Sequence, residues 1–339
     1  MNIIVIGSTG QLGREFVKLG QVQDDLHVYE IGGREDADVA DCYDPYRGQL
    51  HLALIDLTHL CTGDGNGQIH AVINTAALHN ADDCVSDPVT AHNVNALGAA
   101  NVAWFCLRHS DRPICVYIST DYVFGADRQK DSYRPLDGLC PYIHGSDNGV
   151  YGMTKAAGEL ATRAIAPRSL IVRVSTMFGP EPCKGKPDAS LVERVIRHAE
   201  TGRELQMTDD TRTSASYAPD VAEKVVSKLR KMVDHTGGEP KHDVMHAVCS
   251  NQVPHTVLAE MVYKGLGVLP STDYIDGVVE YEGGGYPKGK ITCATSAGTP
   301  RRSALEPLPW SMSGVDAPIS IVEAVRRYIK DKPRSVENE

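Results

Sequence analysis

The sequence has no long apolar segment and no excess of basic residues. No run of about 18 consecutive apolar residues occurs, so we predict no membrane span. The start, Met1 to Gly7, lacks the basic region of a signal peptide, so we expect a cytoplasmic protein. The 34 Lys and Arg residues face 44 Asp and Glu residues, which leaves a net charge of −10. A protein that binds phosphate backbones needs the opposite balance, so we predict no nucleic-acid partner.

Paired cysteines are also missing. Nine cysteines are scattered along the chain, and no two have the C-x-x-C spacing of a zinc knuckle or a thioredoxin motif. Reduced thiols in a reducing compartment are therefore expected. His242 and His246 are four residues apart, as zinc ligands on a helix can be, but no Glu follows His242. We predict no metal site.

The first half of the chain alternates between strand-like and helix-like segments. Apolar runs that end at Gly or polar residues predict strands at 3–6, 27–31, 52–55, 71–74, 114–118 and 170–174. Amphipathic patterns predict helices at 11–20, 88–109 and 151–166. This alternation is typical of right-handed βαβ units and predicts an α/β fold with a Rossmann-type, doubly wound parallel sheet.

Gly and Pro interrupt the pattern often after residue 180. We therefore assign residues 1–180 to the Rossmann domain, completed by a last strand and closing segments from about 206–250. Residues 181–330 are expected to form most of a smaller, irregular α/β C-terminal domain, which a helix at 319–330 closes. The charged residues 331–339 are predicted to be a flexible tail.

A glycine-rich loop with the spacing G-x-x-G-x-x-G joins the first predicted strand to the first predicted helix. Glycine permits the sharp turn and the close approach of the backbone to a pyrophosphate, which then faces free N–H groups at the helix N-terminus. A purely structural turn is the alternative, but the strand–loop–helix context favours a dinucleotide site. The predicted cofactor-binding residues of the loop are Gly7, Thr9, Gly10, Gln11, Leu12 and Gly13.

The end of the second predicted strand favours NADPH as the cofactor, with NADH as the alternative. NAD-binding proteins often place an Asp or Glu at this strand end to hold the adenosine ribose. Here the strand ends in Gly32-Gly33-Arg34, and Glu30 lies further inside it. Arg34 could bind the 2′-phosphate of NADP, or it could be a solvated loop arginine.

Three residues predict acid–base chemistry. Tyr151 and Lys155 are four apart in a predicted helix and so share a face. An ammonium near a phenol lowers its usual pKa of about 10, which suits a general acid or base toward a carbonyl or hydroxyl. Thr120 follows the predicted strand 114–118, at the sheet edge where ligands bind in open α/β folds. A hydroxyl that caps a strand would explain Thr120 alone, but not all three features in this order.

With these motifs the sequence resembles the extended short-chain dehydrogenase/reductase superfamily and, more narrowly, the dTDP-4-dehydrorhamnose reductase family. The resemblance covers nearly the whole chain. It is carried by Gly7–Gly13, Asp56–Thr58, Val72–Ala77, Asn95–Asn101, Ser119–Phe124, Tyr151–Glu159, Leu170–Ser175 and Pro300–Leu305. It implies NADPH-dependent reduction of the C4 ketone of a 4-keto-6-deoxy nucleotide sugar, with dTDP-4-dehydro-L-rhamnose and dTDP-L-rhamnose as the expected substrate and product. The domain of residues 181–330 would then bind the nucleotide sugar.

The resemblance also implies residue roles. The catalytic residues would be Thr120, which polarises the ketone, Tyr151, which protonates it, and Lys155, which tunes the phenol and binds ribose. Further cofactor contacts are implied for Asp56, Leu57, Ala76 and Ala77, beside Tyr151 and Lys155. Implied substrate contacts are Thr120, Asp121, Tyr122, Thr176, Arg301 and Arg302, because guanidinium groups suit a diphosphate.

Departures from the family leave alternatives open. Relatives that dehydrate nucleotide sugars have Asp-Glu after the threonine, whereas Tyr122 follows Asp121 here, which favours simple reduction. The family usually has a tryptophan where Thr176 stands, and the segment 126–149 is longer than usual. A non-catalytic, NADP-binding regulatory subunit, like the β subunit of methionine adenosyltransferase, and a nucleotide-sugar epimerase therefore remain alternatives. Some members dimerise through an acidic contact with magnesium, where Glu15 could sit, so a homodimer stays open.

Overall fold

The computed structural model describes residues 1–32, 53–54, 67–125, 132–141, 149–181, 190–208, 212–234, 241–250, 252–270, 278–283, 286–294, 305–306 and 318–331. A six-stranded sheet forms its centre, in the order β10-β5-β4-β3-β1-β2, and every pairing in it is parallel. Its strands are β1 Asn2–Ile6, β2 His27–Ile31, β3 Ala71–Asn74, β4 Ile114–Thr120, β5 Ser169–Val174 and β10 His242–His246. The strand at one edge, β10, comes from the segment 206–250.

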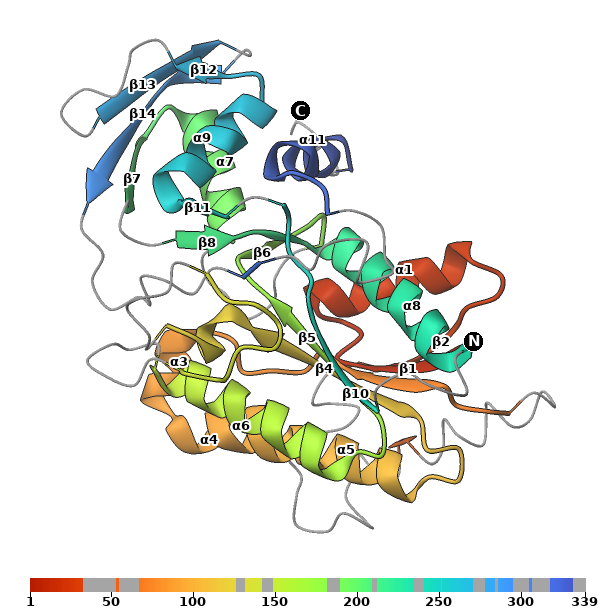
Figure 1. The fold of residues 1–339 in the computed structure, drawn as a ribbon. Coiled ribbons are helices and arrows are strands. Elements are labelled where there is room, and N and C mark those ends of the chain that lie inside the picture. Colours follow the sequence, from red (N-terminus) through yellow and green to blue (C-terminus); the bar gives the residue numbers. More distant parts are fainter. Residues whose placement is uncertain are drawn as a thin grey trace.

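Helices cover both faces of this sheet (Figure 1). One face carries α1 Gln11–Val22 and α8 Ala218–Asp234. The other carries α3 Ala81–Ser86, α4 Pro88–His92, the π-helical turn η1 Asn93–Leu97, α5 Gly98–Arg108 and α6 Gly149–Ile165. Because side chains alternate along a strand, Ile3 of β1 packs in the core under α1, and Ile4 packs in the core under α5. The predicted Rossmann-type α/β fold is confirmed.

Two sequence predictions differ from the structure. Ala53 and Leu54, in the middle of the predicted strand 52–55, are helical, while residues 52 and 55 lie outside the described residues. The predicted helix 88–109 is divided by the π-helical turn, which inserts a wider turn between α4 and α5. Hydrophobic periodicity does not distinguish a short apolar run in a strand from one in a helix, which explains the first error.

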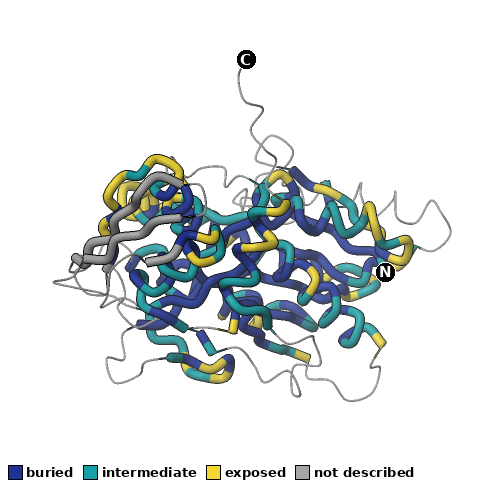
Figure 2. The backbone as a smooth tube through the Cα atoms, turned by 90° about the horizontal axis from the view of Figure 1, so that it is seen from above, coloured by how far each residue is buried: buried dark blue, intermediate teal, exposed yellow. Residues whose placement is uncertain are grey.

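A second group of elements is built around a four-stranded sheet, in the order β12-β13-β14-β7. Its strands are β7 Glu204–Thr208, β12 Leu269–Pro270, β13 Val278–Gly283 and β14 Tyr286–Ala294. The helices α7 Leu191–Thr201, α9 His255–Gly265 and α11 Ile321–Asp331 share a separate apolar core that includes Phe178 and Tyr328. Figure 2 shows buried backbone concentrated in the central strands and exposed backbone on the outer turns.

Short strands connect the two groups. These are β6 Met177–Phe178 with β9 Ser216–Tyr217, and β8 Arg212–Ser214 with β11 Gln252–Pro254. A single 3₁₀ turn, η2 Asp121–Val123, directly follows β4. In the part of the chain that the structure describes, no helix is long and apolar enough to cross a membrane.

Candidate functional site

The glycine loop forms a tight cradle between β1 and α1. Gly7 has a φ of +81°, a left-handed conformation that glycine adopts without strain. A Cβ at Gly13 would lie 2.2 Å from the carbonyl oxygen of Gly7, so the helix can pack on the loop only if residue 13 has no side chain. At Gly10 an added Cβ would meet only the Gly7 oxygen, at 3.2 Å, and otherwise points into open space.

The cradle fits the pyrophosphate of a dinucleotide. Gly10 is the N-cap of α1 and supplies no side-chain hydrogen bond to the first turn, so the N–H groups there stay available for an anion. Gln11, Leu12 and Gly13 are buried in that turn, and Thr9 is exposed at the tip of the loop. The partly buried Ala76 and Ala77 follow β3 at the same sheet edge. The other predicted cofactor residues, Arg34, Asp56 and Leu57, lie outside the described residues.

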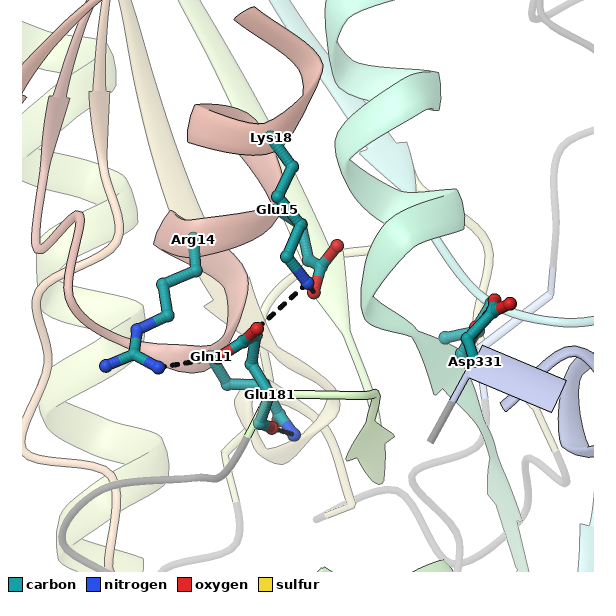
Figure 3. A network of polar contacts seen from close by, with 7 residues as sticks. Gln11, Arg14, Glu15, Lys18, Glu181 and Asp331 are labelled. Carbon is teal, nitrogen blue, oxygen red and sulfur yellow. Dashed lines mark hydrogen bonds and ion pairs between the residues drawn. The ribbon is translucent and has the colours of Figure 1, made fainter. Parts of the chain in front are cut away.

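A charged cluster ties the first helix to the chain that follows β6 (Figure 3). The Gln11 amide donates to the carbonyl oxygen of Glu181 at 2.8 Å, and the Glu181 carboxylate pairs with Arg14 at 2.5 Å and with Lys18 at 3.0 Å. Lys18 also pairs with the buried Glu15 at 3.0 Å, and burial raises the pKa of Glu15. Lys18 therefore balances the charges of both Glu15 and Glu181. Within the described ranges no group of His, Cys, Asp and Glu is arranged to hold a metal.

Thr120 lies at the carboxyl end of β4, where the strand passes into η2. Its Oγ1 accepts a hydrogen bond from the Tyr122 amide at 3.3 Å and donates to Asp121 Oδ1 at 3.1 Å. Tyr151, in the first turns of α6, contacts the edge of the Tyr122 ring, with centroids 5.8 Å apart. Burial raises the pKa of Tyr151, and a hydrogen bond with Thr120 acts in the opposite direction. The phenol is therefore held protonated beside a hydroxyl group.

Lys155 is almost completely buried, with 2% of its surface exposed. Its ammonium donates to the carbonyl oxygen of Ile118 at 2.6 Å and lies 4.1 Å from the centre of the Tyr117 ring. Burial lowers the pKa of Lys155 to about 7, and the charge of Glu159 opposes this shift. The i, i+4 spacing predicts that Lys155 lowers the pKa of Tyr151, whereas in the structure burial dominates and raises that pKa, and a hydrogen bond with Thr120 opposes the shift only in part.

A buried ion pair lies behind these residues. Glu159 Oε1 accepts from Arg173 Nε at 2.9 Å, and Oε2 accepts from Nη2 at 2.8 Å, which is the bidentate geometry of a strong pair. Ser119, next to Thr120, donates to the same carboxylate at 2.5 Å. Arg173 Nη1 donates to the Pro135 carbonyl at 3.0 Å and lies 3.4 Å from His246 Nε2.

The hydrogen bonds of His246 fix its tautomer. Because Arg173 can only donate, Nε2 of His246 accepts, and Nδ1 carries the proton toward the Glu306 carbonyl at 2.9 Å. Burial and the charge of Arg173 lower the pKa of His246 to about 3. Arg173 thus links α6 to residues 132–141 and, through His246, to residues 305–306, which follow the predicted arginine pair in sequence.

Asn95, in the π-helical turn, joins the segment that follows β3 to α6. Its side-chain oxygen accepts from the Leu78 amide at 2.9 Å, and its nitrogen donates to the Leu78 carbonyl at 3.0 Å and to Thr154 Oγ1 at 3.1 Å. The backbone carbonyl of Asn95 accepts from the Tyr117 hydroxyl at 2.8 Å. Turns of this kind are frequent at functional sites, and only the Asn-rich segment gave a signal for it in the sequence.

Polar side chains continue from Asp121 into β8. Ser175 donates to Asp121 Oδ2 at 2.7 Å and contacts Thr213 Oγ1 at 2.9 Å. Thr176 follows, with its Oγ1 2.6 Å from that of Thr213. Thr176 has a φ of +34°, which for a β-branched residue costs about 1–3 kcal/mol and is typical of functional sites.

The structure therefore brings most of the predicted site residues to one edge of the sheet. Thr120 is bonded to Asp121 and Tyr122, and the Tyr122 ring contacts that of Tyr151. Hydroxyl contacts extend from Asp121 to Thr176. Arg301 and Arg302 lie outside the described residues. Leu305, three positions later, is bonded through its backbone to the Ser214 hydroxyl.

Comparisons with known proteins show which family this chain belongs to. The family model described as "RmlD substrate binding domain" matches residues 1–332. A dTDP-4-dehydrorhamnose reductase of Mycolicibacterium smegmatis is 31% identical over 205 residues, which cover 60% of this chain and 56% of that protein. The spore coat polysaccharide biosynthesis protein SpsK of Bacillus subtilis is 32% identical over 174 residues, or 51% of this chain and 55% of that protein. The matches therefore span little more than half of these relatives.

Solved structures share the fold over nearly the whole chain. A dTDP-4-dehydrorhamnose reductase from Bacillus anthracis, in complex with NADP, has a TM-score of 0.71 and 20% identity, and covers 98% of this chain and 99% of its own. A dTDP-4-dehydrorhamnose reductase from Clostridium acetobutylicum has the same TM-score and 24% identity, and covers 97% and 99%. At these identities the likeness establishes the fold.

Proposed function

Because the chain belongs to the family of the RmlD substrate binding domain, we propose that it reduces the C4 ketone of a 4-keto-6-deoxy nucleotide sugar with NADPH. The predicted family is thereby confirmed. The observation that carries the proposed activity is the place of Thr120 at the carboxyl end of β4, bonded to Tyr122, whose ring contacts that of Tyr151, with Lys155 buried in the same helix as Tyr151. The intact glycine cradle supports the cofactor.

In the proposed reaction NADPH, when bound, supplies the hydride. Tyr151 gives its proton to the ketone oxygen, and burial keeps that proton in place until the oxygen becomes basic. Thr120 donates to Asp121 when no substrate is bound, and in the proposed reaction it turns this proton to the ketone oxygen, which stabilises the developing negative charge. Lys155, with its pKa near 7, provides a positive charge behind the phenol when protonated.

The names of relatives support dTDP-4-dehydro-L-rhamnose as the substrate and dTDP-L-rhamnose as the product. The NADP in the Bacillus anthracis structure supports NADPH over NADH. Arg301 and Arg302 stay our candidates for binding the diphosphate of the substrate.

We also propose a cytoplasmic location and a homodimer. Cell fractionation tests the location, and analytical ultracentrifugation tests the oligomeric state.

The decisive experiment measures enzyme-dependent oxidation of NADPH with dTDP-4-dehydrorhamnose, generated in situ from dTDP-glucose. Rapid loss of NADPH absorbance is the expected result. Tyr151→Phe, which removes one oxygen, should lower kcat at least a hundredfold and leave the Kd for NADPH unchanged, since general acid catalysis contributes about 10²–10⁴-fold. Undiminished turnover in that variant would remove Tyr151 from the mechanism. NADPH binding without any binding of nucleotide sugar would favour the regulatory-subunit alternative instead.

A further inference from the structure

A row of hydroxyl groups leads from the Asp121 carboxylate to a partly exposed threonine. Ser175 Oγ donates to Asp121 Oδ2 at 2.7 Å, and Thr213 Oγ1 lies 2.9 Å from Ser175 Oγ. Thr176 Oγ1 lies 2.6 Å from Thr213 Oγ1. Asp121, Ser175 and Thr213 are buried, whereas Thr176 is partly exposed. Thr176 is therefore the end of the row that a ligand can reach.

The carboxylate fixes the direction of the hydrogens in this row. A hydroxyl group has one proton and two lone pairs, and an ionised carboxylate only accepts. Because Ser175 uses its proton on Asp121, the contact between Ser175 and Thr213 requires the proton of Thr213. The contact between Thr213 and Thr176 then requires the proton of Thr176. Thr176 is left with a lone pair and presents an acceptor.

Thr213 has a second acceptor within reach, the carbonyl oxygen of Ser214, at the longer distance of 3.2 Å. If Thr213 donated there, no hydrogen would remain between Ser175 and Thr213, although their oxygens are 2.9 Å apart. The shorter contact is satisfied only when Thr213 donates to Ser175. The acceptor at Thr176 thus follows from the distances between these oxygens together with the charge of Asp121.

We infer that Thr176, held by Thr213, is a specificity-determining residue that accepts a hydrogen bond from a hydroxyl group of the sugar. This inference rests on the proposed function, because Asp121 also accepts from Thr120, the hydroxyl assigned to the ketone. The left-handed backbone of Thr176 is an independent sign, since strain of this kind persists where a site requires it. An acceptor distinguishes a hydroxyl group from hydrogen and from fluorine, neither of which donates.

The test compares wild type and Thr176→Val on the 4-keto nucleotide sugar and on analogues in which one ring hydroxyl at a time is replaced by hydrogen or fluorine. Valine keeps the branched shape and removes the acceptor. We expect Thr176→Val to lower kcat/KM about five- to tenfold on the full sugar, mainly through KM. For one ring position, the deoxy and fluoro analogues should lower kcat/KM of wild type by the same five- to tenfold. They should not lower kcat/KM of Thr176→Val below its value on the full sugar. Thr176→Ser, which keeps the hydroxyl, should recover most of the loss.

If every analogue lowered kcat/KM of wild type and of Thr176→Val by the same factor, the inference would be overturned. The proposed reductase activity would not be affected by that result. Failure of wild type to oxidise NADPH with any keto sugar would instead overturn the proposed function. In that case calorimetric titration with the product nucleotide sugar decides the subsite separately, because equal Kd values for wild type and variant would refute it. Thr213→Val leaves the strained residue untouched, and we expect it to raise KM by a similar factor. A normal KM in this variant would also refute the inference.

Discussion

Removing the charge of Arg173 should destabilise the protein more than any comparable change at its surface. Arg173 and Glu159 have 2% and 0% of their side-chain surfaces exposed and are joined by two hydrogen bonds. Arg173→Met leaves the Glu159 carboxylate buried without its cation, and breaking such a pair costs about 3–5 kcal/mol. The Pro135 carbonyl loses its donor as well, which adds to the loss.

The change in the free energy of unfolding would be measured by urea denaturation, followed by fluorescence and circular dichroism in parallel. Arg134→Met is the matched control, because the pair of Arg134 with Glu306 has 77% and 36% of its side-chain surfaces exposed and should contribute about 0–1 kcal/mol. In the double variant with Glu159→Leu, part of the loss should return, since neither member of the pair is then left as a buried charge without the other. A loss below 1 kcal/mol for Arg173→Met, or a double variant as unstable as the sum of its singles, would refute this reasoning.

Two further predictions concern the cofactor cradle and acid stability. Gly10→Val should abolish measurable NADPH binding with little change in thermal stability, because a side chain there points into the open cradle. Gly13→Ala should instead lower the thermal stability, because its Cβ would lie 2.2 Å from the Gly7 oxygen. Fluorescence titration and melting curves separate the two variants, and normal NADPH affinity in Gly10→Val would contradict the loop assignment. His246 stays neutral in the folded protein down to a pKa of about 3, whereas unfolded histidine binds a proton near 6.5. Stability should therefore fall by up to about 1.4 kcal/mol per pH unit as the pH drops from 6.5 toward 3, and this part of the slope should vanish in His246→Asn.

Local patterns were sufficient to predict the frame of the site. The buried run Ile3–Ile6 with a glycine loop after it specifies a strand, a tight turn and a helix, and the structure contains all three. Likewise, Thr120 is predicted at the carboxyl edge of the sheet, and β4 ends there at Thr120. These features depend on residues near one another in sequence, or on the rule that parallel strands end at a common edge.

The supporting contacts could not be predicted, because each joins residues far apart in sequence. Ser175 and Thr213 are brought together only when β8 packs beside the end of β5, and His246 reaches Arg173 only through the pairing of β10 with β5. One signal was nevertheless available. Arg173 is the single charged residue in the otherwise apolar or small strand Ser169–Val174, and an arginine buried in such a strand requires a partner. Glu159, on the buried side of α6 behind Lys155, supplies it.

The position of that ion pair explains why a charged rather than an apolar contact suits this place. An apolar pair would bury as much surface, but it would not hold the Ser119 hydroxyl, the Pro135 carbonyl and His246 in fixed directions. Through these bonds the helix that carries Tyr151 is aligned with β4 and with the segments around 135 and 306. A loss of alignment would move these segments relative to Tyr151. Arg173→Met should therefore lower kcat more than its loss of stability accounts for, since a displacement of about 1 Å can cost a hundredfold in rate.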